Sequence, residues 1–81
     1  MQLSVRLFAR ARDLAGSESV TVELPEEASI ADLKSALQSQ HAGLAPIVPH
    51  LLVAVGTDYA DDSTKLDASA DVSCFPPVSG G

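Results

Sequence analysis

The chain has 81 residues and a formal net charge of −6, and 46 % of its residues are hydrophobic while only 4 % are aromatic. This length is typical of one domain with a modest aliphatic core, and it excludes a deep catalytic cleft within the chain itself. Five Lys and Arg against eleven Asp and Glu do not make a phosphate-binding surface, which argues against nucleic acid as a partner and favours a basic docking face on another protein.

The N-terminal residues predict two strands joined by a short connection. Residues 2–9 alternate between apolar and polar side chains, which is typical of a half-buried strand and places Ala9 on its buried face and Phe8 on the other. Residues 10–16 predict a loop or a turn of helix, and residues 20–24 predict a second alternating strand. The two strands are expected to form a hairpin.

One helix is predicted after Pro25. Ser29 followed by Asp32 is a capping-box pattern, which marks a helix N-terminus, and Gly43 is the expected stop. The apolar residues that follow Ser29 recur with helical spacing and predict a buried face. They are Ile30, Leu33, Ala36 and Leu37.

The second half of the chain predicts two or three short strands. The unbroken apolar run 51–55 is typical of a strand covered on both faces, or of one that pairs beside the first strand. Gly56 begins a turn, Tyr59 opens a short element, and Leu66 is expected to fill the core. Residues 71–75 predict the last strand, with Cys74 on its buried side.

This order of elements predicts an α+β β-grasp, or ubiquitin-like, fold: a mixed sheet with one main helix packed across it. Residues 1–75 are expected to form one domain and residues 76–81 an extended C-terminal tail. Cys74 is the only cysteine, which excludes an internal disulfide and fits a reducing compartment. No apolar run approaches the roughly 18 residues of a membrane span, and none follows a charged segment at Met1, so we expect a soluble cytoplasmic protein.

The tail is the most informative segment of the sequence. Pro76 and Pro77 restrict the backbone to extended shapes, so the tail should project as a stiff rod that reaches about 20 Å at roughly 3.3 Å per residue. Gly80 and Gly81 lack a Cβ and can enter a slot that is too narrow for other residues. A terminal carboxylate becomes reactive when it is joined to the α-phosphate of a nucleotide, and a thiol, an amine or sulfide can then capture it.

Three stretches carry a family pattern: residues 8–16, residues 52–55 with Tyr59 just beyond, and residues 75–81. Through them the whole chain resembles the small subunit of molybdopterin synthase, the sulfur carrier of molybdenum cofactor synthesis. A diglycine end alone is shared with ubiquitin-like modifiers and with the thiamine-pathway carrier, whereas the diproline at this spacing is similar to the molybdopterin branch. The chain departs from the usual family pattern at Gly56 and at residues 68–70, Ala-Ser-Ala, where an Asn and an acidic turn are usual.

The resemblance implies a cycle of sulfur transfer. An adenylating partner enzyme would use ATP to activate the Gly81 carboxylate, a sulfur donor would convert it to a thiocarboxylate, and the tail would enter the large subunit. There the sulfur would pass to a cyclic pterin precursor. The resemblance also implies a heterotetramer of two small and two large subunits, with the catalytic side chains on the large subunit and no cofactor bound by this chain.

The site residues assigned from the sequence lie in the tail and around it. Gly81 is the reacting end, Gly80 gives it clearance, and the segment Pro76, Pro77, Val78 and Ser79 positions the tail and contacts the partner. Exposed aromatic residues give a docking surface much buried area at little entropic cost, so we assign Phe8 and Phe75 to a partner interface. Arg12 is either a further contact, to an acid of the partner, or a solvated surface residue.

Other polar residues do not form a recognisable site in the sequence. His41 and His50 lack the spacing and companion ligands of a metal site, and the acids of residues 58–62 lack the pattern of a calcium loop, so no metal is expected. Cys74 has no nearby positive charge in the sequence and is expected to behave as a small apolar residue.

Three other functions stay open at this stage. The first is a ubiquitin-like protein modifier, in which Gly81 would form an isopeptide bond with a lysine. The second is a sulfur carrier for thiamine or cysteine synthesis. The third is a pure interaction domain, whose activity would survive removal of Gly81.

Overall fold

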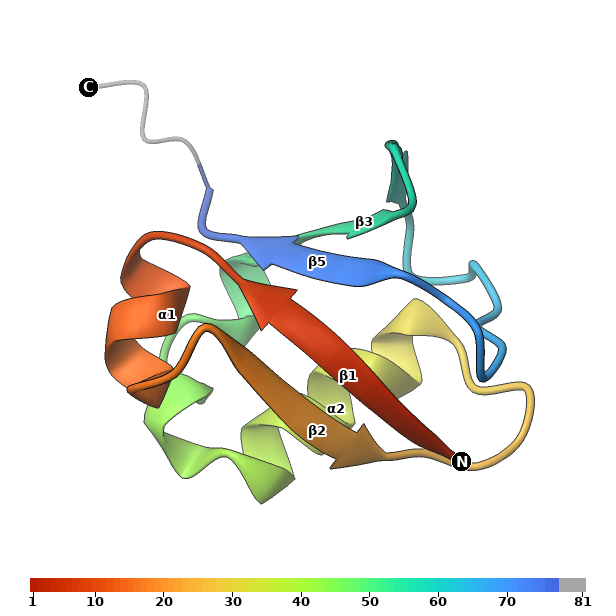
Figure 1. Ribbon diagram of the computed structural model, residues 1–81, viewed down its shortest axis with the longest axis horizontal. Helices are drawn as coiled ribbons and strands as arrows, with labels where there is room; N and C mark the ends of the chain where they lie inside the picture. Colours follow the sequence, from red (N-terminus) through yellow and green to blue (C-terminus); the bar gives the residue numbers. More distant parts are fainter. Residues whose placement is uncertain (78–81) are drawn as a thin grey trace.

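A mixed five-stranded sheet with one long helix across it forms the body of the protein (Figure 1). The computed structural model describes residues 1–77. The elements in chain order are β1 Gln2–Leu7, α1 Arg10–Ala15, β2 Ser19–Glu23, α2 Ile30–Gln40, the 3-10 turns η1 Ala42–Leu44 and η2 Val48–His50, β3 Leu52–Val55, β4 Asp58–Ala60 and β5 Val72–Phe75.

The strands lie in the order β2-β1-β5-β3-β4. β1 and β5 run parallel at the centre, and the other neighbouring pairs are antiparallel. The expected hairpin of the first two strands is confirmed by the β1–β2 pairing, and the α+β plan with a mixed sheet is confirmed as a whole. The apolar run 51–55 contributes β3, but β5 separates it from β1, so the prediction that it pairs beside the first strand is wrong.

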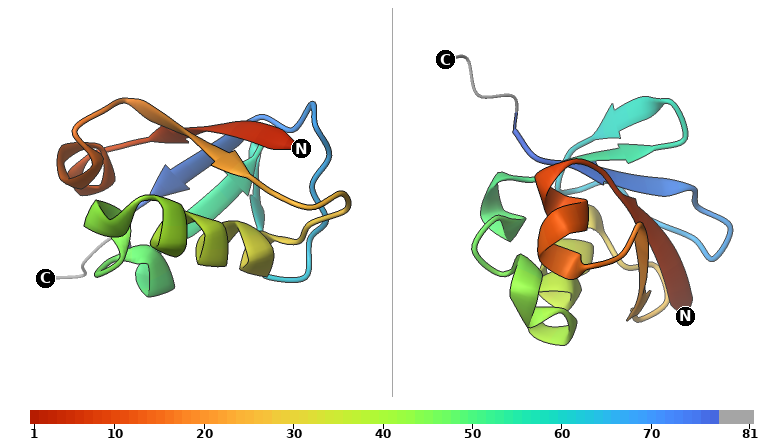
Figure 2. Two further views of the ribbon diagram at one scale, coloured as in Figure 1. Left: turned by 90° about the horizontal axis from the view of Figure 1, so that it is seen from below. Right: turned by 60° about the vertical axis from the view of Figure 1, so that its left-hand side comes forward.

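The core lies between the sheet and α2. Figure 2 shows α2 crossing one face of the sheet, as the buried side of a β-grasp requires. The alternation of β1 and β2 and the helical spacing of α2 bring their apolar residues to this layer, which confirms the predicted faces. The fully buried side chains include Val5, Val22, Ile30, Leu33, Leu37, Leu44, Val48, Val72 and Cys74.

Two predicted boundaries differ from the structure. β1 ends at Leu7, and Ala9 is exposed with φ 54° and ψ −129°, because the chain reverses there to begin α1. α2 ends at Gln40, before Gly43. Gly43 instead lies where η1 meets α1, and a Cβ at this position would be 2.8 Å from the backbone oxygen of Leu14. Its small size therefore serves close packing and not the helix stop.

The N-terminus of α2 carries the predicted capping box. The Ser29 hydroxyl accepts a hydrogen bond from the Asp32 N–H, and the Asp32 carboxylate accepts one from the Ser29 N–H at 2.9 Å. These bonds with Ser29 lower the pKa of Asp32 below its ordinary value of 3.8. A lowered folded-state pKa means that this stabilisation is present above pH 3.8 and is lost as the pH falls through the lowered pKa.

Replacing Ser29 with alanine is expected to lower the free energy of unfolding by about 1 kcal/mol, because the N–H of Asp32 loses its acceptor. Urea unfolding followed by circular dichroism measures this difference. Ser35→Ala is the matched control, since Ser35 is exposed within the same helix and makes no cap. An equal loss in both variants would contradict the capping role.

The two edge strands of the sheet, β2 and β4, differ in whether other parts of the chain hydrogen-bond to them. On β2, the side-chain amide of Gln40 accepts from the Glu23 N–H at 2.9 Å and donates to the Glu23 oxygen at 3.0 Å, and a ring nitrogen of His41 lies 2.9 Å from the Thr21 oxygen. The C-terminal end of α2 therefore occupies this edge. Among residues 1–77, no hydrogen bond reaches β4 except from β3.

Candidate functional site

The base of the tail lies at the end of the two central strands. β5 ends at Phe75, and the β1–β5 register pairs Leu7 with Cys74. The Phe8 N–H donates to the Cys74 oxygen at 3.3 Å, which carries this pairing one residue further. Phe8 and Phe75 are thereby brought side by side, and their rings stack with centroids 4.8 Å apart at 11°. The expectation that these two aromatic residues are neighbours is confirmed.

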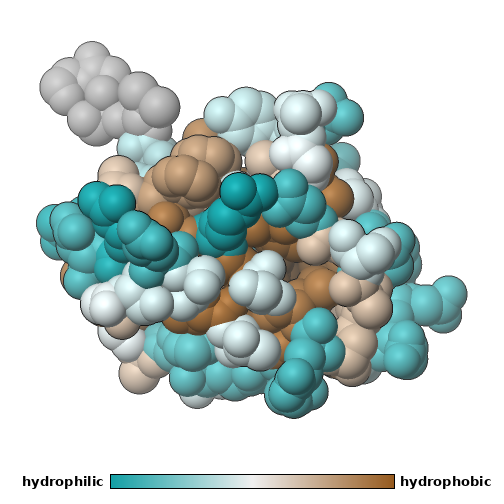
Figure 3. Space-filling model, viewed as in Figure 1, coloured by the Kyte–Doolittle hydropathy of each residue, from teal (hydrophilic) through white to brown (hydrophobic). Residues whose placement is uncertain are grey.

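Two further apolar residues join this pair. The β3–β5 register places Leu52 opposite Phe75, and Tyr59 of β4 meets the Phe75 ring edge-on at 6.4 Å and 69°. Phe8 and Leu52 are each 40 % exposed and Tyr59 is 72 % exposed, so this apolar group faces solvent. We call Phe8, Leu52, Tyr59 and Phe75 the aromatic surface. In Figure 3, hydrophobic residues gather over the end of β5 on the face that is shown.

Sequence reasoning missed Leu52 and Tyr59 as members of this site. Leu52 stands in an unbroken apolar run, and one of the two alternatives for that run was a strand covered on both faces. The exposure of Leu52 contradicts this alternative. The strand alternation from Leu51, which is buried, through Leu52 to Val53, which is buried, carries the signal that Leu52 faces outward. Edge-on aromatic packing of this kind contributes about 0.5–1.5 kcal/mol beyond the buried area, which favours the observed arrangement of Tyr59 and Phe75.

Arg12 lies beside the aromatic surface. It is exposed on α1, and with Arg6, Leu7, Phe8 and Glu18 it lines a hollow of about 230 Å³. Among residues 1–77 the ion pairs are Arg6 with Asp71 and Lys34 with Asp62, and Arg12 has none. The structure therefore brings Arg12 together with Phe8, at a place where its guanidinium can reach another molecule.

Cys74 has no access to solvent. The residue is fully buried, and burial raises the pKa of its thiol to about 12. Because the thiolate is the reactive form, this cysteine is a packing residue of the core.

Among residues 1–77, no group of three or more His, Cys, Asp or Glu could hold a metal ion. In the same part of the chain, no helix has the length and hydropathy that a bilayer span needs.

The tail is described only at its start. Pro76 is half-buried against the body and Pro77 is exposed. Val78, Ser79, Gly80 and Gly81, which include the assigned reacting end, lie outside the described residues. Of the residues assigned from the sequence, the structure thus places Phe8, Phe75, Arg12, Pro76 and Pro77 at one end of the molecule.

Comparison with known proteins finds the same family by sequence and by structure. Residues 5–81 match the model of the ThiS family. The molybdopterin synthase sulfur carrier subunit of Homo sapiens is 29 % identical over 83 residues, which cover 99 % of this chain and 94 % of that protein. The resemblance noted from the sequence is therefore confirmed.

Solved structures share the fold over the full length. The crystal structure of SAMP1 from Haloferax volcanii has a TM-score of 0.84 and 28 % identity, with all of both chains covered. A chain in the complex of subunits 1 and 2 of the molybdopterin-converting factor from Helicobacter pylori has a TM-score of 0.69 and 24 % identity, also over both full chains, which shows the same fold. With its sequence matched from residue 5 to residue 81 and its β-grasp architecture in place, the chain belongs to the ThiS family.

Proposed function

We propose that this protein is the sulfur carrier and small subunit of a molybdopterin synthase. The observation that carries the proposal is its similarity, over almost its whole length, to proteins named molybdopterin synthase sulfur carrier subunit. The aromatic surface at the base of a Pro-Pro-Val-Ser-Gly-Gly end supports it, because a carrier needs a docking face beside its reacting terminus.

The chemistry takes place at the carboxylate of Gly81. One of its oxygens attacks the α-phosphate of ATP, which releases pyrophosphate and leaves an acyl-adenylate. Sulfide then attacks the acyl carbon and AMP leaves, so a thiocarboxylate forms without any change of oxidation state. The thiocarboxylate sulfur is the nucleophile that attacks the cyclic pterin precursor in molybdenum cofactor synthesis. Water then hydrolyses the resulting thioester, so the sulfur stays on the pterin and Gly81 returns to a carboxylate.

The partners follow from this chemistry. An adenylating enzyme uses ATP, and the large subunit supplies the catalytic side chains, as the resemblance to molybdopterin synthase implies. The buried Cys74 of this chain is not an activated nucleophile. We assign the aromatic surface and Arg12 to docking, Pro76 to Ser79 to insertion of the tail, and Gly80 to clearance. We further propose an assembly of two small and two large subunits, located in the cytoplasm.

A second candidate function is that of a protein modifier. It is favoured by the likeness to SAMP1, a protein described as a small archaeal modifier protein. In that case an amine captures the acyl-adenylate and an isopeptide bond forms with a lysine of the target. A carrier for thiamine or cysteine synthesis would form the same thiocarboxylate and differ only in the acceptor.

Intact mass of the C-terminal peptide tests the proposal. After incubation with a cognate adenylating enzyme, ATP and sulfide, we expect a gain in mass equal to the replacement of one oxygen by sulfur. A variant that lacks Gly81 is the control and should show no gain. A ladder of conjugated proteins without thiocarboxylate would favour the modifier, and an unchanged mass with a demonstrably active enzyme would overturn both.

A further inference from the structure

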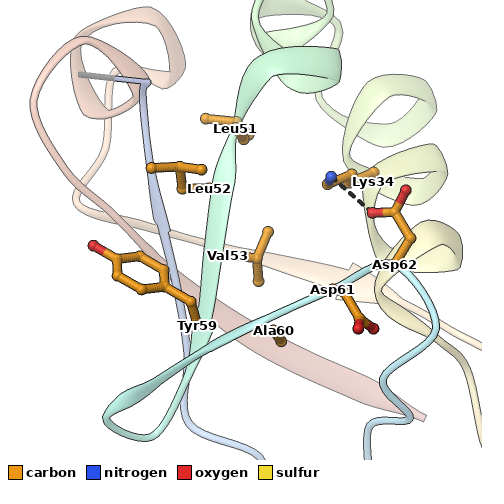
Figure 4. A pocket seen from close by; sticks show the side chains of 8 residues that line it. All are labelled: Lys34, Leu51, Leu52, Val53, Tyr59, Ala60, Asp61 and Asp62. Atoms are coloured by element: carbon orange, nitrogen blue, oxygen red, sulfur yellow. Dashed lines mark hydrogen bonds and ion pairs between the residues drawn. The ribbon is translucent and has the colours of Figure 1, made fainter. Parts of the chain in front are cut away.

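A second hollow adjoins the aromatic surface on the side of β4. It has a volume of about 500 Å³ and lies between β3, the end of β4 and α2 (Figure 4). Leu52 and Tyr59 belong to both the hollow and the aromatic surface, so the two features meet around the β3–β4 edge of the sheet, with Leu51 and Val53 on the opposite side of β3 from Leu52. The residues that line the hollow are Lys34, Leu51, Leu52, Val53, Tyr59, Ala60, Asp61 and Asp62.

The hollow has an apolar interior and a charged rim. Leu51 and Val53 are 3 % and 2 % exposed and form its inner wall with Ala60. On the rim, the Lys34 ammonium donates to the Asp62 carboxylate at 2.9 Å (Figure 4). Asp61 stands next to this pair, and no Lys or Arg of residues 1–77 forms an ion pair with it.

Asp61 is held in place by its own loop. Its Oδ1 accepts hydrogen bonds from the Ser63 N–H at 3.1 Å, the Ser63 hydroxyl at 2.7 Å and the Thr64 hydroxyl at 3.2 Å. These bonds lower its pKa below the ordinary 3.8, so the carboxylate is ionised at neutral pH. In Figure 4 the Asp61 carboxylate points outward from the rim, so it favours an occupant that places an apolar group in the hollow and a cation just beyond the rim.

The sheet edge beside the hollow is open. Side chains of α2 occupy the outer edge of β2, whereas within residues 1–77 nothing hydrogen-bonds to the outer edge of β4. A free strand edge can pair with an extended segment of another chain. The hollow is also open to solvent, unlike the enclosed pockets in which small ligands are usually buried.

We infer that this hollow is a second docking site for the protein that covers the aromatic surface, and that it takes a short extended segment in which an aliphatic side chain neighbours a lysine or arginine. The aliphatic side chain packs on Leu51 and Val53, and the cation pairs with Asp61. The inference rests on the proposed function, because it identifies that protein as the large subunit of molybdopterin synthase.

Calorimetric titration of the full chain with the purified large subunit from the same organism, at low and at moderate salt, tests this inference. Asp61→Asn keeps an oxygen for the bonds from Ser63 but removes the charge. We expect it to raise Kd by about three- to tenfold and to weaken the dependence of Kd on salt. Ala60→Leu fills the hollow and should raise Kd by about tenfold or more, with thermal unfolding as the check on its fold.

Asp67→Asn is the matched control. The Oδ1 of Asp67 accepts from the N–H and the hydroxyl of Ser69, as Asp61 does from Ser63, but Asp67 does not line the hollow. Its Kd should stay within about twofold of the unaltered chain.

The outcomes separate the inference from the proposed function. If Asp61→Asn and Ala60→Leu bind as tightly as the unaltered chain while Phe75→Ala does not, the second docking site is disproved and the carrier function stands. An equal rise in Kd for Asp61→Asn and Asp67→Asn also overturns the inference. Binding would then depend on the net charge of the chain and not on a carboxylate at the hollow. An unaltered chain that does not bind the large subunit overturns both.

Discussion

Replacing Phe75 with alanine is expected to weaken binding to the large subunit by about 30-fold or more, the effect of losing a central interface residue. The Phe75 ring is the centre of the aromatic surface, since it stacks on Phe8 at 4.8 Å and meets Tyr59 edge-on at 6.4 Å. Its removal therefore takes away one apolar contact and the support of two others.

The change in affinity is measured by calorimetric titration with the purified large subunit, and urea unfolding shows whether the variant is folded. Tyr59→Phe is the control, because it keeps the ring of an exposed member of the same surface and removes only the hydroxyl. Its affinity should stay within about threefold of the unaltered chain. Binding by Phe75→Ala with unchanged Kd would show that the partner docks elsewhere.

A large loss of stability is expected from Leu37→Ala. Leu37 is fully buried on the face of α2 that packs against the sheet. Truncation of a buried leucine removes transfer free energy and leaves a cavity, which together cost about 2–5 kcal/mol. Small domains have about 0.05–0.15 kcal/mol of stability per residue, so this loss is a large share of the total.

Urea unfolding measures this difference as a shift of the midpoint at constant slope. Leu37→Met is the matched control, since it keeps the volume and should cost less than about 1.5 kcal/mol. A loss below about 1 kcal/mol for Leu37→Ala would mean that α2 is not packed on the sheet as described.

Local patterns gave the elements of the fold, because they are set by neighbours in the sequence. The alternation in β1 and β2, and the pairing of Ser29 with Asp32, depend on residues only two or three positions apart. Strand order is different. The insertion of β5 between β1 and β3 joins residues far apart in the chain, and no local pattern in the run 51–55 distinguishes pairing with β1 from pairing with β5.

The candidate site could be predicted only where it depends on local strand patterns. Phe8 and Phe75 were found because strand alternation places both on outward faces, and their contact follows from the parallel pairing of β1 with β5. Tyr59 was missed because its approach to Phe75 depends on how β4 turns back after Gly56. The backward turn at Ala9, with its positive φ, could not be predicted either, because alanine rarely adopts that conformation.

The central position of β5 has a mechanical consequence. The strand that leads into the tail is hydrogen-bonded along both sides, to β1 and to β3. A force on the C-terminus must therefore break the hydrogen bonds of β5 with both neighbouring strands before β5 leaves the sheet. An edge strand is held on one side only and can be separated one hydrogen bond at a time. A partner protein that binds the terminus can therefore act on it while the body that presents it stays folded.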